Sequence, residues 1–212
     1  EGFKIKALED RKVAAMVALR YDQVRSPIKP ASGWKNQVPG GKEVVLPVNN
    51  GLERRFGMIL AEDGNTYNTL QIFSGKQDEK PIGAVKVNEW SDWIYDSFKD
   101  SGETKKVAYK VKLLGGEADG SRYELYYSYA LDMTNKLWMY PSSLTEELYE
   151  HCGPIMHHSY CGNHQVMAET YQMMYDWYSR AIAYLMSNYE WYLLYIHVHA
   201  LDYANHIYQN AI

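Results

Sequence analysis

The alternation of apolar and polar residues between positions 106 and 113 is the feature that most limits how this chain can fold. Apolar residues stand at every second position, and the positions between them are mostly lysines. The apolar members are Val107, Tyr109, Val111 and Leu113. Successive side chains of an extended strand point to opposite faces, so the pattern predicts a strand with one buried face and one lysine-bearing face.

Asp-Gly pairs divide this part of the chain into hairpins. The pair that begins at Asp63 separates residues 56–61 from residues 66–73, and a second pair begins at Asp119. Asp-Gly suits the tight turn of an antiparallel hairpin, because glycine adopts a positive φ without strain. Residues 42–140 are therefore predicted to form a β-rich insert.

Beyond Pro141 the pattern becomes helical. Ser143 and Glu146 have the spacing of a capping box, in which a hydroxyl and a carboxylate bond the first free backbone amides of a helix. Apolar residues then recur near a period of 3.6 from residue 163 to residue 187, which predicts a long amphipathic helix. A further short helix is expected at residues 202–210.

Residues 191–198 form a continuous apolar run with β-branched and aromatic members. Such a run after a helix is typical of a central parallel strand that is covered on both faces. The predicted fold class is therefore α/β, as part of a doubly wound parallel sheet core with a β-rich (α+β) insert. In this organisation residues 1–41 supply a helix and linker of the core, residues 42–140 the insert, and residues 141–212 a core segment.

Asp202 and His206 follow this predicted strand. Ligands of open α/β sheets bind beyond the carboxyl ends of the strands, and a spacing of four places both side chains on one helix face. A carboxylate and an imidazole so placed suit zinc, iron or manganese better than calcium. An aspartate at a helix start is also a common N-cap, and a tight site needs further ligands. His197 and His199 are expected to be packed residues rather than ligands.

The overall charge and the length of the apolar stretches exclude two classes of partner. The formal net charge is −4 and no basic run is present, so a nucleic-acid surface is not expected. No apolar stretch reaches the length of a membrane-spanning helix. The compartment stays open between cytoplasmic and exported. The first residues have neither an initiator methionine nor an apolar signal core, which favours a removed leader or a segment of a longer chain.

The stretch from His151 to His164 is rich in metal-capable side chains. It includes Cys152 and Cys161, whose spacing matches no zinc finger. A structural loop is the favoured interpretation, and a disulfide or two free thiols both stay open. An enzyme with a cysteine nucleophile is a further alternative, but nothing in the sequence positions a base and an orienting acid beside either thiol.

Several short segments stand in a recognisable order along the chain. They are residues 89–94 (Glu-Trp-Ser-Asp-Trp-Ile), 108–114, 124–128 (Glu-Leu-Tyr-Tyr-Ser), 141–154 and 191–208. Together they resemble the alkaline phosphatase superfamily, in its type I phosphodiesterase and nucleotide pyrophosphatase-like branch. In that group a β-rich insert precedes a long helix and a strand that delivers an Asp-x3-His metal pair.

The resemblance implies a hydrolase of phosphodiesters or nucleotide pyrophosphates that holds two divalent metal ions, commonly zinc. Asp202 and His206 would ligate one ion, while the Thr or Ser nucleophile is expected upstream of these residues. No catalytic residue is assigned within the chain, which is expected to be inactive by itself. Tyr192 departs from the family-like pattern, which more often has an aspartate there. Residues 42–140 would lie over the active-site mouth and select the small phosphoester substrate.

A non-catalytic binding module for carbohydrate or a protein partner is the main alternative. The chain has 20 tyrosines against 4 phenylalanines, and tyrosine has an apolar ring with a polar tip. Aromatic rings exposed on strands stack on sugars, although aromatic-rich strands are more often ordinary core. Ligand binding that survives a chelator and the Asp202→Ala substitution would favour this alternative.

Overall fold

The computed structural model of the protein describes most of the chain. The described residues are 4–5, 27–36, 38–48, 53–62, 64–100, 102–135, 139–157 and 163–197. The chain divides into two compact units, Glu1–Tyr149 (unit 1) and Glu150–Ile212 (unit 2).

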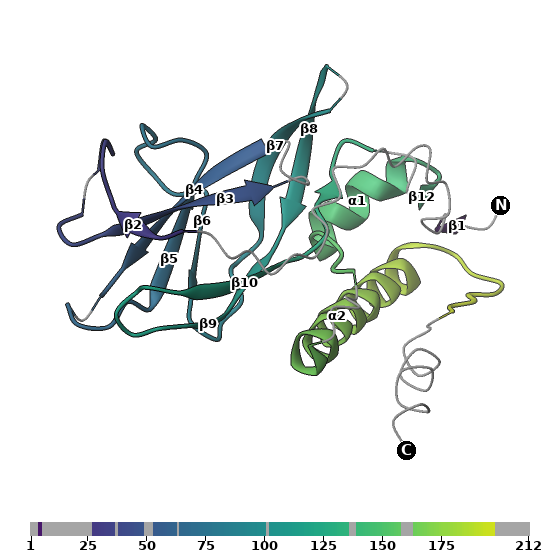
Figure 1. Cartoon of the computed structure of the whole chain (residues 1–212). Coiled ribbons are helices and arrows are strands. Elements are labelled where there is room, and N and C mark those ends of the chain that lie inside the picture. Colours follow the sequence, from purple (N-terminus) through teal and green to yellow (C-terminus); the bar gives the residue numbers. More distant parts are fainter. Residues whose placement is uncertain are drawn as a thin grey trace. The chain divides into compact units, whose positions relative to one another are not determined.

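Unit 1 is built mainly from β-strands (Figure 1). In chain order they are β1 (Lys4–Ile5), β2 (Lys29–Pro30), β3 (Lys42–Val48), β4 (Glu53–Leu60), β5 (Thr69–Phe73), β6 (Gly83–Lys86), β7 (Ile94–Asp100), β8 (Glu103–Tyr109), β9 (Val111–Gly116), β10 (Tyr123–Tyr127), β11 (Leu131–Asp132) and β12 (Met139–Tyr140). They form four sheets with the strand orders β1-β12, β10-β9, β11-β8-β7 and β2-β3-β4-β5-β6.

Every strand pair in these sheets is antiparallel. A parallel contact occurs only as an isolated bridge between Val87 and Leu113, among the residues that are described. The prediction of a doubly wound parallel sheet core is therefore wrong. It depended on assigning residues 191–198 to a buried parallel strand, and a local apolar pattern does not determine which strand becomes the neighbour.

One apolar core joins three of the four sheets of unit 1. It draws side chains from the five-stranded sheet, from β7 and β8, and from β9 and β10, so the sheets pack face to face. Its buried members are Val44, Leu46, Ile59, Leu70, Ile72, Val85, Ile94, Phe98, Val107, Tyr109, Val111, Leu113, Tyr123, Leu125 and Tyr127. The four apolar residues predicted between positions 107 and 113 are all buried. The single strand predicted there is wrong, because β8 ends at Tyr109 and β9 begins at Val111 in a different sheet. Fully burying one large apolar side chain stabilises a fold by about 1.5–3 kcal/mol, so this core dominates the stability of unit 1.

Both predicted Asp-Gly hairpins are confirmed. β4 pairs with β5 across the turn that contains Gly64, and β9 pairs with β10 across the turn that contains Gly120. These glycines have φ values of +74° and +69°, which residues with a Cβ rarely adopt. A Cβ at Gly120 would also lie 2.7 Å from the Tyr67 ring, so both backbone conformation and space require glycine there.

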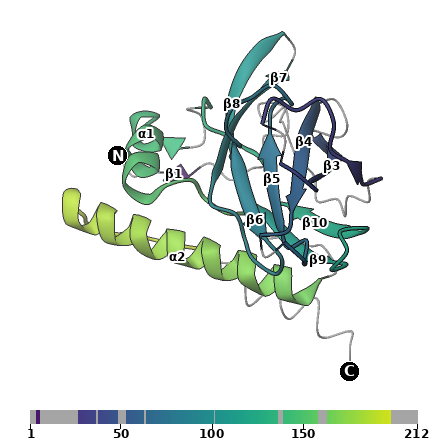
Figure 2. The same ribbon diagram turned by 90° about the vertical axis from the view of Figure 1, so that its left-hand side faces the viewer.

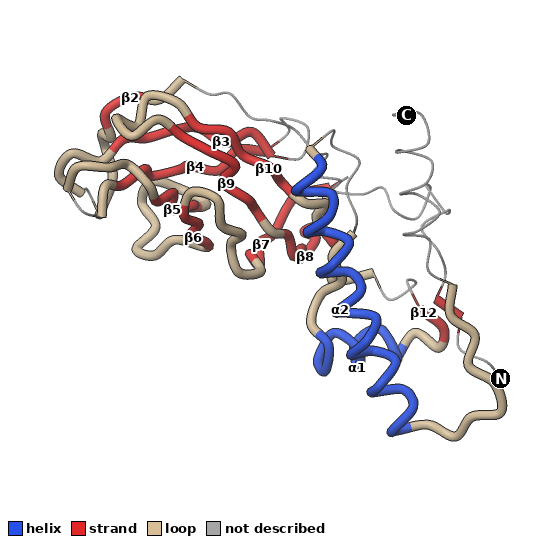
Figure 3. The backbone as a smooth tube through the Cα atoms, turned by 90° about the horizontal axis from the view of Figure 1, so that it is seen from below, coloured by secondary structure: helices blue, strands red, loops and turns tan. Residues whose placement is uncertain are grey.

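The two predicted helices are confirmed, and Figure 3 shows them in blue. α1 (Ser143–Cys152) ends before Gly153, which has a φ of +72°. α2 (His164–Asn188) begins after Asn163, whose side chain accepts a hydrogen bond from the Val166 backbone amide at 3.1 Å. Within the described part of the chain, neither helix is long and apolar enough to cross a membrane.

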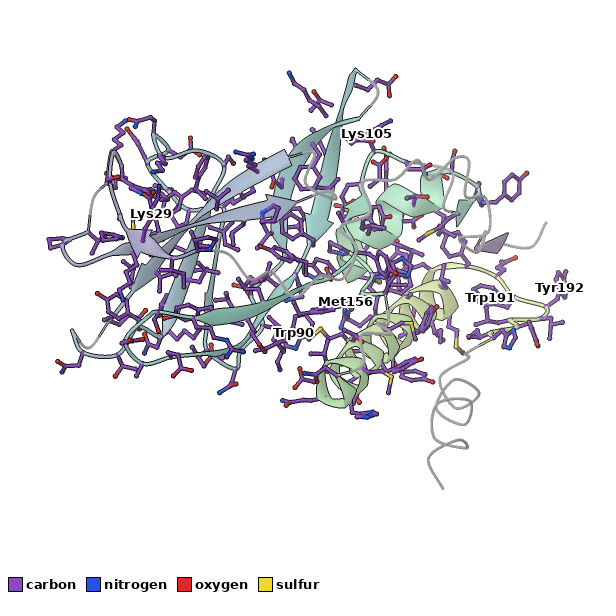
Figure 4. The ribbon with its side chains drawn as sticks, viewed as in Figure 1. Lys29, Trp90, Lys105, Met156, Trp191 and Tyr192 are labelled. Atoms are coloured by element: carbon purple, nitrogen blue, oxygen red, sulfur yellow. The ribbon has the colours of Figure 1, made fainter. Side chains whose placement is uncertain are left out.

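The apolar run after α2 is not a strand. Residues 189–197 have no regular structure, and Tyr192, Leu193 and Tyr195 are 109%, 82% and 81% exposed. Figure 4 shows the Tyr192 side chain pointing away from the chain. The predicted buried strand is wrong because such a run needs a sheet to cover it, and the described part of unit 2 contains no strand.

The first 41 residues differ from the prediction in two places. Residues 4–25 have a helical pattern, but Lys4 and Ile5 form β1, which pairs with β12. Residues 6–26 lie outside the described part, as does the helix predicted at residues 202–210. The predicted linker that ends at residue 41 contains the short strand β2, which pairs with β3.

Candidate functional site

The predicted metal ligands Asp202 and His206 lie outside the described residues, as does His199. His197, predicted to be a packed, hydrogen-bonded residue rather than a ligand, is exposed, so the packing part of that prediction is wrong. Within the described ranges, no three side chains of His, Cys, Asp or Glu come together as a metal-binding group. The metal pair therefore stays a prediction from the sequence.

Cys152 carries a free, buried thiol, and Cys161 lies outside the described residues. Burial raises the pKa of the Cys152 thiol, with the nearby Arg180 guanidinium acting in the opposite direction. A protonated, 6% exposed thiol is a poor nucleophile, because thiolates rather than thiols attack. These facts weigh against a cysteine-nucleophile enzyme that uses Cys152.

Unit 1 carries a surface in which lysines alternate with aromatic rings along one side of β7, β8 and β9. We call it the lysine–aromatic face. Its members are Trp90, Trp93, Tyr95, Lys106, Lys110 and Lys112. Tyr95 and Lys106 have the opposite strand parity to the core residues Ile94 and Val107, so they project from the outer side of the β7–β8 sheet. Lys112 has the opposite parity to Val111 on β9, a strand of another sheet, and it is only 3% exposed.

Two lysines of this face lie over tryptophan rings. Lys110 Nζ is 5.5 Å from the centre of the Trp93 ring, and Lys112 Nζ is 5.6 Å from the centre of the Trp90 ring. Cation–π contacts of this kind contribute about 0.5–2 kcal/mol, and more where water is excluded. Trp90 also packs edge-on against Tyr126, with the ring centres 5.5 Å apart. The cations are thus held in place by the rings.

The backbone before β7 holds the tryptophans against β9. Trp90 forms a bridge with Lys112, and the Ser91 amide donates to the Val111 carbonyl at 2.8 Å. The Ser91 side chain accepts from the Val111 amide at 3.0 Å, and Ser91 is 2% exposed. The Ser91 carbonyl accepts from Lys110 Nζ at 2.6 Å. Ser91 therefore fixes the segment from both its backbone and its side chain.

Tyr95 is the most accessible ring of the face. It is 60% exposed and lies opposite Ala108 in the β7–β8 register. Lys106, two residues before Ala108 on β8, is therefore a diagonal neighbour of Tyr95, at about 7–8 Å. Lys110 follows the end of β8, and its ammonium donates to the Ser91 carbonyl at 2.6 Å and lies over the Trp93 ring. Tyr95 is thus a solvent-accessible ring with one lysine beside it on the sheet.

The charge on this side of the hairpin is positive. The outward positions of β7 are Tyr95, Ser97 and Lys99, and those of β8 are Thr104, Lys106 and Ala108, so none is a carboxylate. Burial lowers the pKa of Lys110, and the nearby Asp92 carboxylate opposes that shift. The surface favours an anionic ligand with a flat or sugar-like portion, and these residues include no nucleophile–base pair.

A buried ion pair supports the face from beneath. Arg55 of β4 binds Asp96 of β7 through two hydrogen bonds, Nε to Oδ2 at 2.8 Å and Nη2 to Oδ1 at 3.0 Å. Their side chains are 8% and 5% exposed. Arg55 Nη2 also donates to the Ser97 carbonyl at 2.9 Å, and Tyr109 Oη donates to Asp96 at 3.0 Å. Burial, together with the Asp96 charge, raises the pKa of Tyr109, which keeps this hydroxyl a donor.

The β7–β8 hairpin that carries Tyr95 and Lys106 is long and twisted, and its tip extends beyond the neighbouring strands of unit 1 (Figure 2). An edge strand such as β7 exposes backbone groups that other chains can pair with. Here the Ser97 carbonyl is bound by Arg55, and the Ser97 amide donates to Asp96 Oδ1 at 2.7 Å. The middle of this edge is therefore already occupied by side chains.

A second buried carboxylate, Glu43 of β3, ties two loops onto the outer face of the five-stranded sheet. It accepts from Trp34 Nε1 at 2.7 Å, from the Ser32 amide at 3.1 Å and from Lys76 Nζ at 2.7 Å. Lys29 adds an ion pair at 3.2 Å. Burial raises the pKa of Glu43, but these four partners together outweigh it and lower the pKa to about 2.

We expect Glu43→Gln to lower the free energy of unfolding at neutral pH by roughly 1.5–3 kcal/mol, because it removes charged hydrogen bonds. The folded-state pKa of Glu43 is depressed. Its stabilisation is therefore fully present above pH 4.5 and is lost as the pH falls towards 2. Urea unfolding of the wild type and of Glu43→Gln at pH 7, 4 and 2.5 measures this loss. The difference between their free energies of unfolding should become smaller as the pH falls.

Glu79→Gln provides the control for this prediction. Glu79 pairs with Lys35 at 2.6 Å, but its side chain is 73% exposed. An exposed pair contributes about 0–1 kcal/mol, so this variant should unfold almost like the wild type at each pH. A pH-independent difference between wild type and Glu43→Gln would contradict the proposed role of the Glu43 charge.

Sequence reasoning did not assemble the lysine–aromatic face. The lysines between residues 106 and 112 are expected to face water, yet Lys112 is only 3% exposed. The available signal was the tryptophan pair at positions 90 and 93, close in the chain to a strand with a lysine at alternate positions. The sequence pattern does not show that the segment before β7 runs alongside β9.

Comparison of the chain with protein-family models, with curated proteins and with solved structures finds no match. The function is therefore argued from the chain's own residues.

Proposed function

We propose that this chain is the ester-binding part of a metal-dependent phosphoester hydrolase. The carrying observation is the 60% exposed Tyr95 ring, which has Lys106 as its diagonal neighbour, among outward positions of β7 and β8 that carry no carboxylate. A phosphoester combines an anionic group with an organic group. The lysines would neutralise the first, and the ring would stack on the second.

The hydrolytic chemistry in this proposal belongs to a divalent ion, with zinc preferred and manganese or iron as alternatives. Asp202 and His206 are the residues of this chain that would hold it, and the resemblance described above supports their role. A bound divalent ion polarises a phosphoryl oxygen and lowers the pKa of a bound water. The chain itself contributes binding and orientation of the ester, and no nucleophile is assigned to it.

Binding of phenyl phosphate to the full chain tests the proposal. We expect the Lys106→Gln/Lys110→Gln variant to bind it roughly tenfold more weakly, because each partly exposed charge contributes up to about 1 kcal/mol. Wild-type binding should weaken as salt is raised from low to physiological concentration. Heteronuclear NMR titration measures both effects and reports whether the Tyr95 and Lys106 amide signals shift.

Lys80→Gln is the matched control, because Lys80 is an exposed lysine in the loop between β5 and β6. It should bind phenyl phosphate like the wild type. Equal binding by the double variant, or no binding by the wild type, would overturn the proposal.

A carbohydrate-binding module is the second candidate. Tyr95 is 60% exposed, and Trp90 and Trp93 are half-buried, so the face offers rings to a neutral sugar as well. Phenyl β-glucoside distinguishes the two functions, since it keeps the ring and replaces the phosphate by a sugar. Binding of the glucoside that is unaffected by salt and by the double lysine variant would favour the carbohydrate module.

A further inference from the structure

Lys110 lies in the break between β8 and β9, and its backbone is fixed there from both sides. Its amide donates to the Ser128 hydroxyl oxygen at 2.8 Å, and its carbonyl accepts from the Ser128 amide at 2.9 Å. Ser128 is itself 1% exposed. The base of the Lys110 side chain therefore has one defined position, as a group that reacts with a bound molecule requires.

The amino group of Lys110 is held at the other end of the side chain. Nζ donates to the Ser91 carbonyl at 2.6 Å and lies 5.5 Å from the centre of the Trp93 ring. Lys110 and Trp93 are both half-buried, so a small molecule can reach the amine and the ring from solvent. A carbonyl accepts a hydrogen bond from a neutral amine as well as from an ammonium, so the Ser91 contact survives loss of the proton.

Lys110 has no carboxylate in an ion pair with it, within the part of the chain that the structure describes. Other lysines of unit 1 do have such partners at 2.6–3.2 Å, namely Lys29, Lys35, Lys76, Lys86 and Lys105. A carboxylate partner stabilises the ammonium and keeps the amine unreactive. At Lys110, burial lowers the pKa and outweighs the opposing charge of Asp92, so a larger share of this amine is neutral.

We propose that Lys110 is a reactive amine that forms an imine with an aromatic aldehyde seated against the Trp93 ring. The lone pair of the neutral Nζ adds to the aldehyde carbon, and a proton passes from the nitrogen to the oxygen. The resulting carbinolamine loses water, and a C=N bond replaces the C=O bond without any oxidant or reductant. Desolvated lysines are good nucleophiles towards carbonyl groups, and two flat rings stack favourably.

This site goes beyond ester binding and does not require it. The aldehyde is recognised by the ring and the amine, and it needs no anionic group. Two other lysines of unit 1 provide comparisons. Lys112 lies over the Trp90 ring at 5.6 Å but is 3% exposed, so an aldehyde cannot reach it. Lys80 is an exposed loop lysine and sets the ordinary reactivity.

Labelling of the full chain with pyridoxal, an aromatic aldehyde without a phosphate, tests this proposal. Less than one equivalent is added at neutral pH, and sodium borohydride then reduces each imine to a stable secondary amine. Peptide mass spectrometry measures the labelled fraction of each lysine. Lys110 should be labelled about tenfold more than Lys80, and Lys112 should stay almost unlabelled. Labelling of Lys110 no greater than that of Lys80 would overturn the proposal.

Trp93→Leu removes the ring and should lower the labelling of Lys110 to about the level of Lys80. Butanal tests the same point on the wild type, whether or not that variant folds. The ratio of Lys110 to Lys80 labelling should be lower with this aliphatic aldehyde than with pyridoxal. An equal ratio for the two aldehydes, or a folded Trp93→Leu variant labelled like the wild type, would remove the ring from the site and overturn the proposal.

Lys110→Arg keeps a cation at this position but cannot form the imine, so total incorporation of pyridoxal should fall. The outcome is separable from that of the ester-binding test. Selective labelling of Lys110 in a protein that does not bind phenyl phosphate would support the imine site and remove only the proposed ester function.

Discussion

Arg55→Met is expected to lower the free energy of unfolding of the protein by about 3–5 kcal/mol, because it leaves the Asp96 carboxylate buried without its charged partner. The two side chains are 8% and 5% exposed and share two hydrogen bonds. Arg55 also bonds the Ser97 carbonyl and lies over the Phe98 ring, 4.8 Å from its centre. Urea unfolding followed by tryptophan fluorescence measures the loss.

Two further variants separate the charge pair from other effects. Arg54→Met removes the neighbouring, exposed arginine and should change stability by less than about 0.5 kcal/mol. Arg55→Met combined with Asp96→Val should recover part of the loss, because replacing both members of a buried pair by apolar groups is often neutral. A loss no greater than that of Arg54→Met would show that the pair does not hold β4 against β7.

Arg55→Met should also weaken ligand binding at the lysine–aromatic face. Asp96 precedes Ser97 on β7, and the pair holds the strand that carries Tyr95. Loss of this support increases the freedom of the ring and raises the entropy cost of binding. In the proposed function, structural support and ester binding would therefore be coupled through the adjacent residues Tyr95 and Asp96 of β7.

Asp202→Ala is expected to weaken zinc binding by the chain on the order of 100-fold or more. Loss of a residue that only orients a metal ligand already costs about 10–100-fold, so loss of a direct ligand should cost at least as much. Titration of metal-free protein with zinc by calorimetry measures the effect. Zinc binding should also weaken as the pH falls below about 6.5, since a coordinating histidine must be neutral.

His206→Ala should reproduce the loss seen with Asp202→Ala, because both side chains are predicted to hold one ion. Asp176→Ala supplies the control, since Asp176 is an exposed carboxylate of α2 that accepts a hydrogen bond from Gln172. Zinc affinity unchanged in both predicted ligand variants would remove the metal pair from the proposed function, while leaving ester binding by the lysine–aromatic face to be judged separately.

Local patterns predicted the elements of this protein well. The alternation between residues 106 and 113 predicted the buried side of β8 and β9, and the Asp-Gly pairs predicted two hairpins. The capping-box pattern at Ser143 and Glu146 and the 3.6-residue period after residue 163 predicted both helices, although α1 begins at Ser143 itself. These features depend on backbone conformation and on neighbours a few residues away, and a sequence records both directly.

The candidate site was less accessible from the sequence. Trp90 reaches Lys112 because the chain before β7 crosses beside β9, and Arg55 meets Asp96 across 41 positions. Such contacts depend on which strands become neighbours. The two-residue alternation of a strand is the same whichever strand lies beside it, so it does not identify the neighbour. The prediction for residues 191–198 failed for the same reason.

The sequence by itself determined the two Asp-Gly hairpins and the helices near residues 143 and 163, because turn chemistry and hydrophobic period are local properties. Only the tertiary structure decided which sheets the strands join, that residues 191–197 form no strand, that Lys112 is buried and that Tyr192 faces water. These outcomes depend on which distant surfaces meet, since burial and charge pairing are properties of the assembled sheets rather than of any one segment.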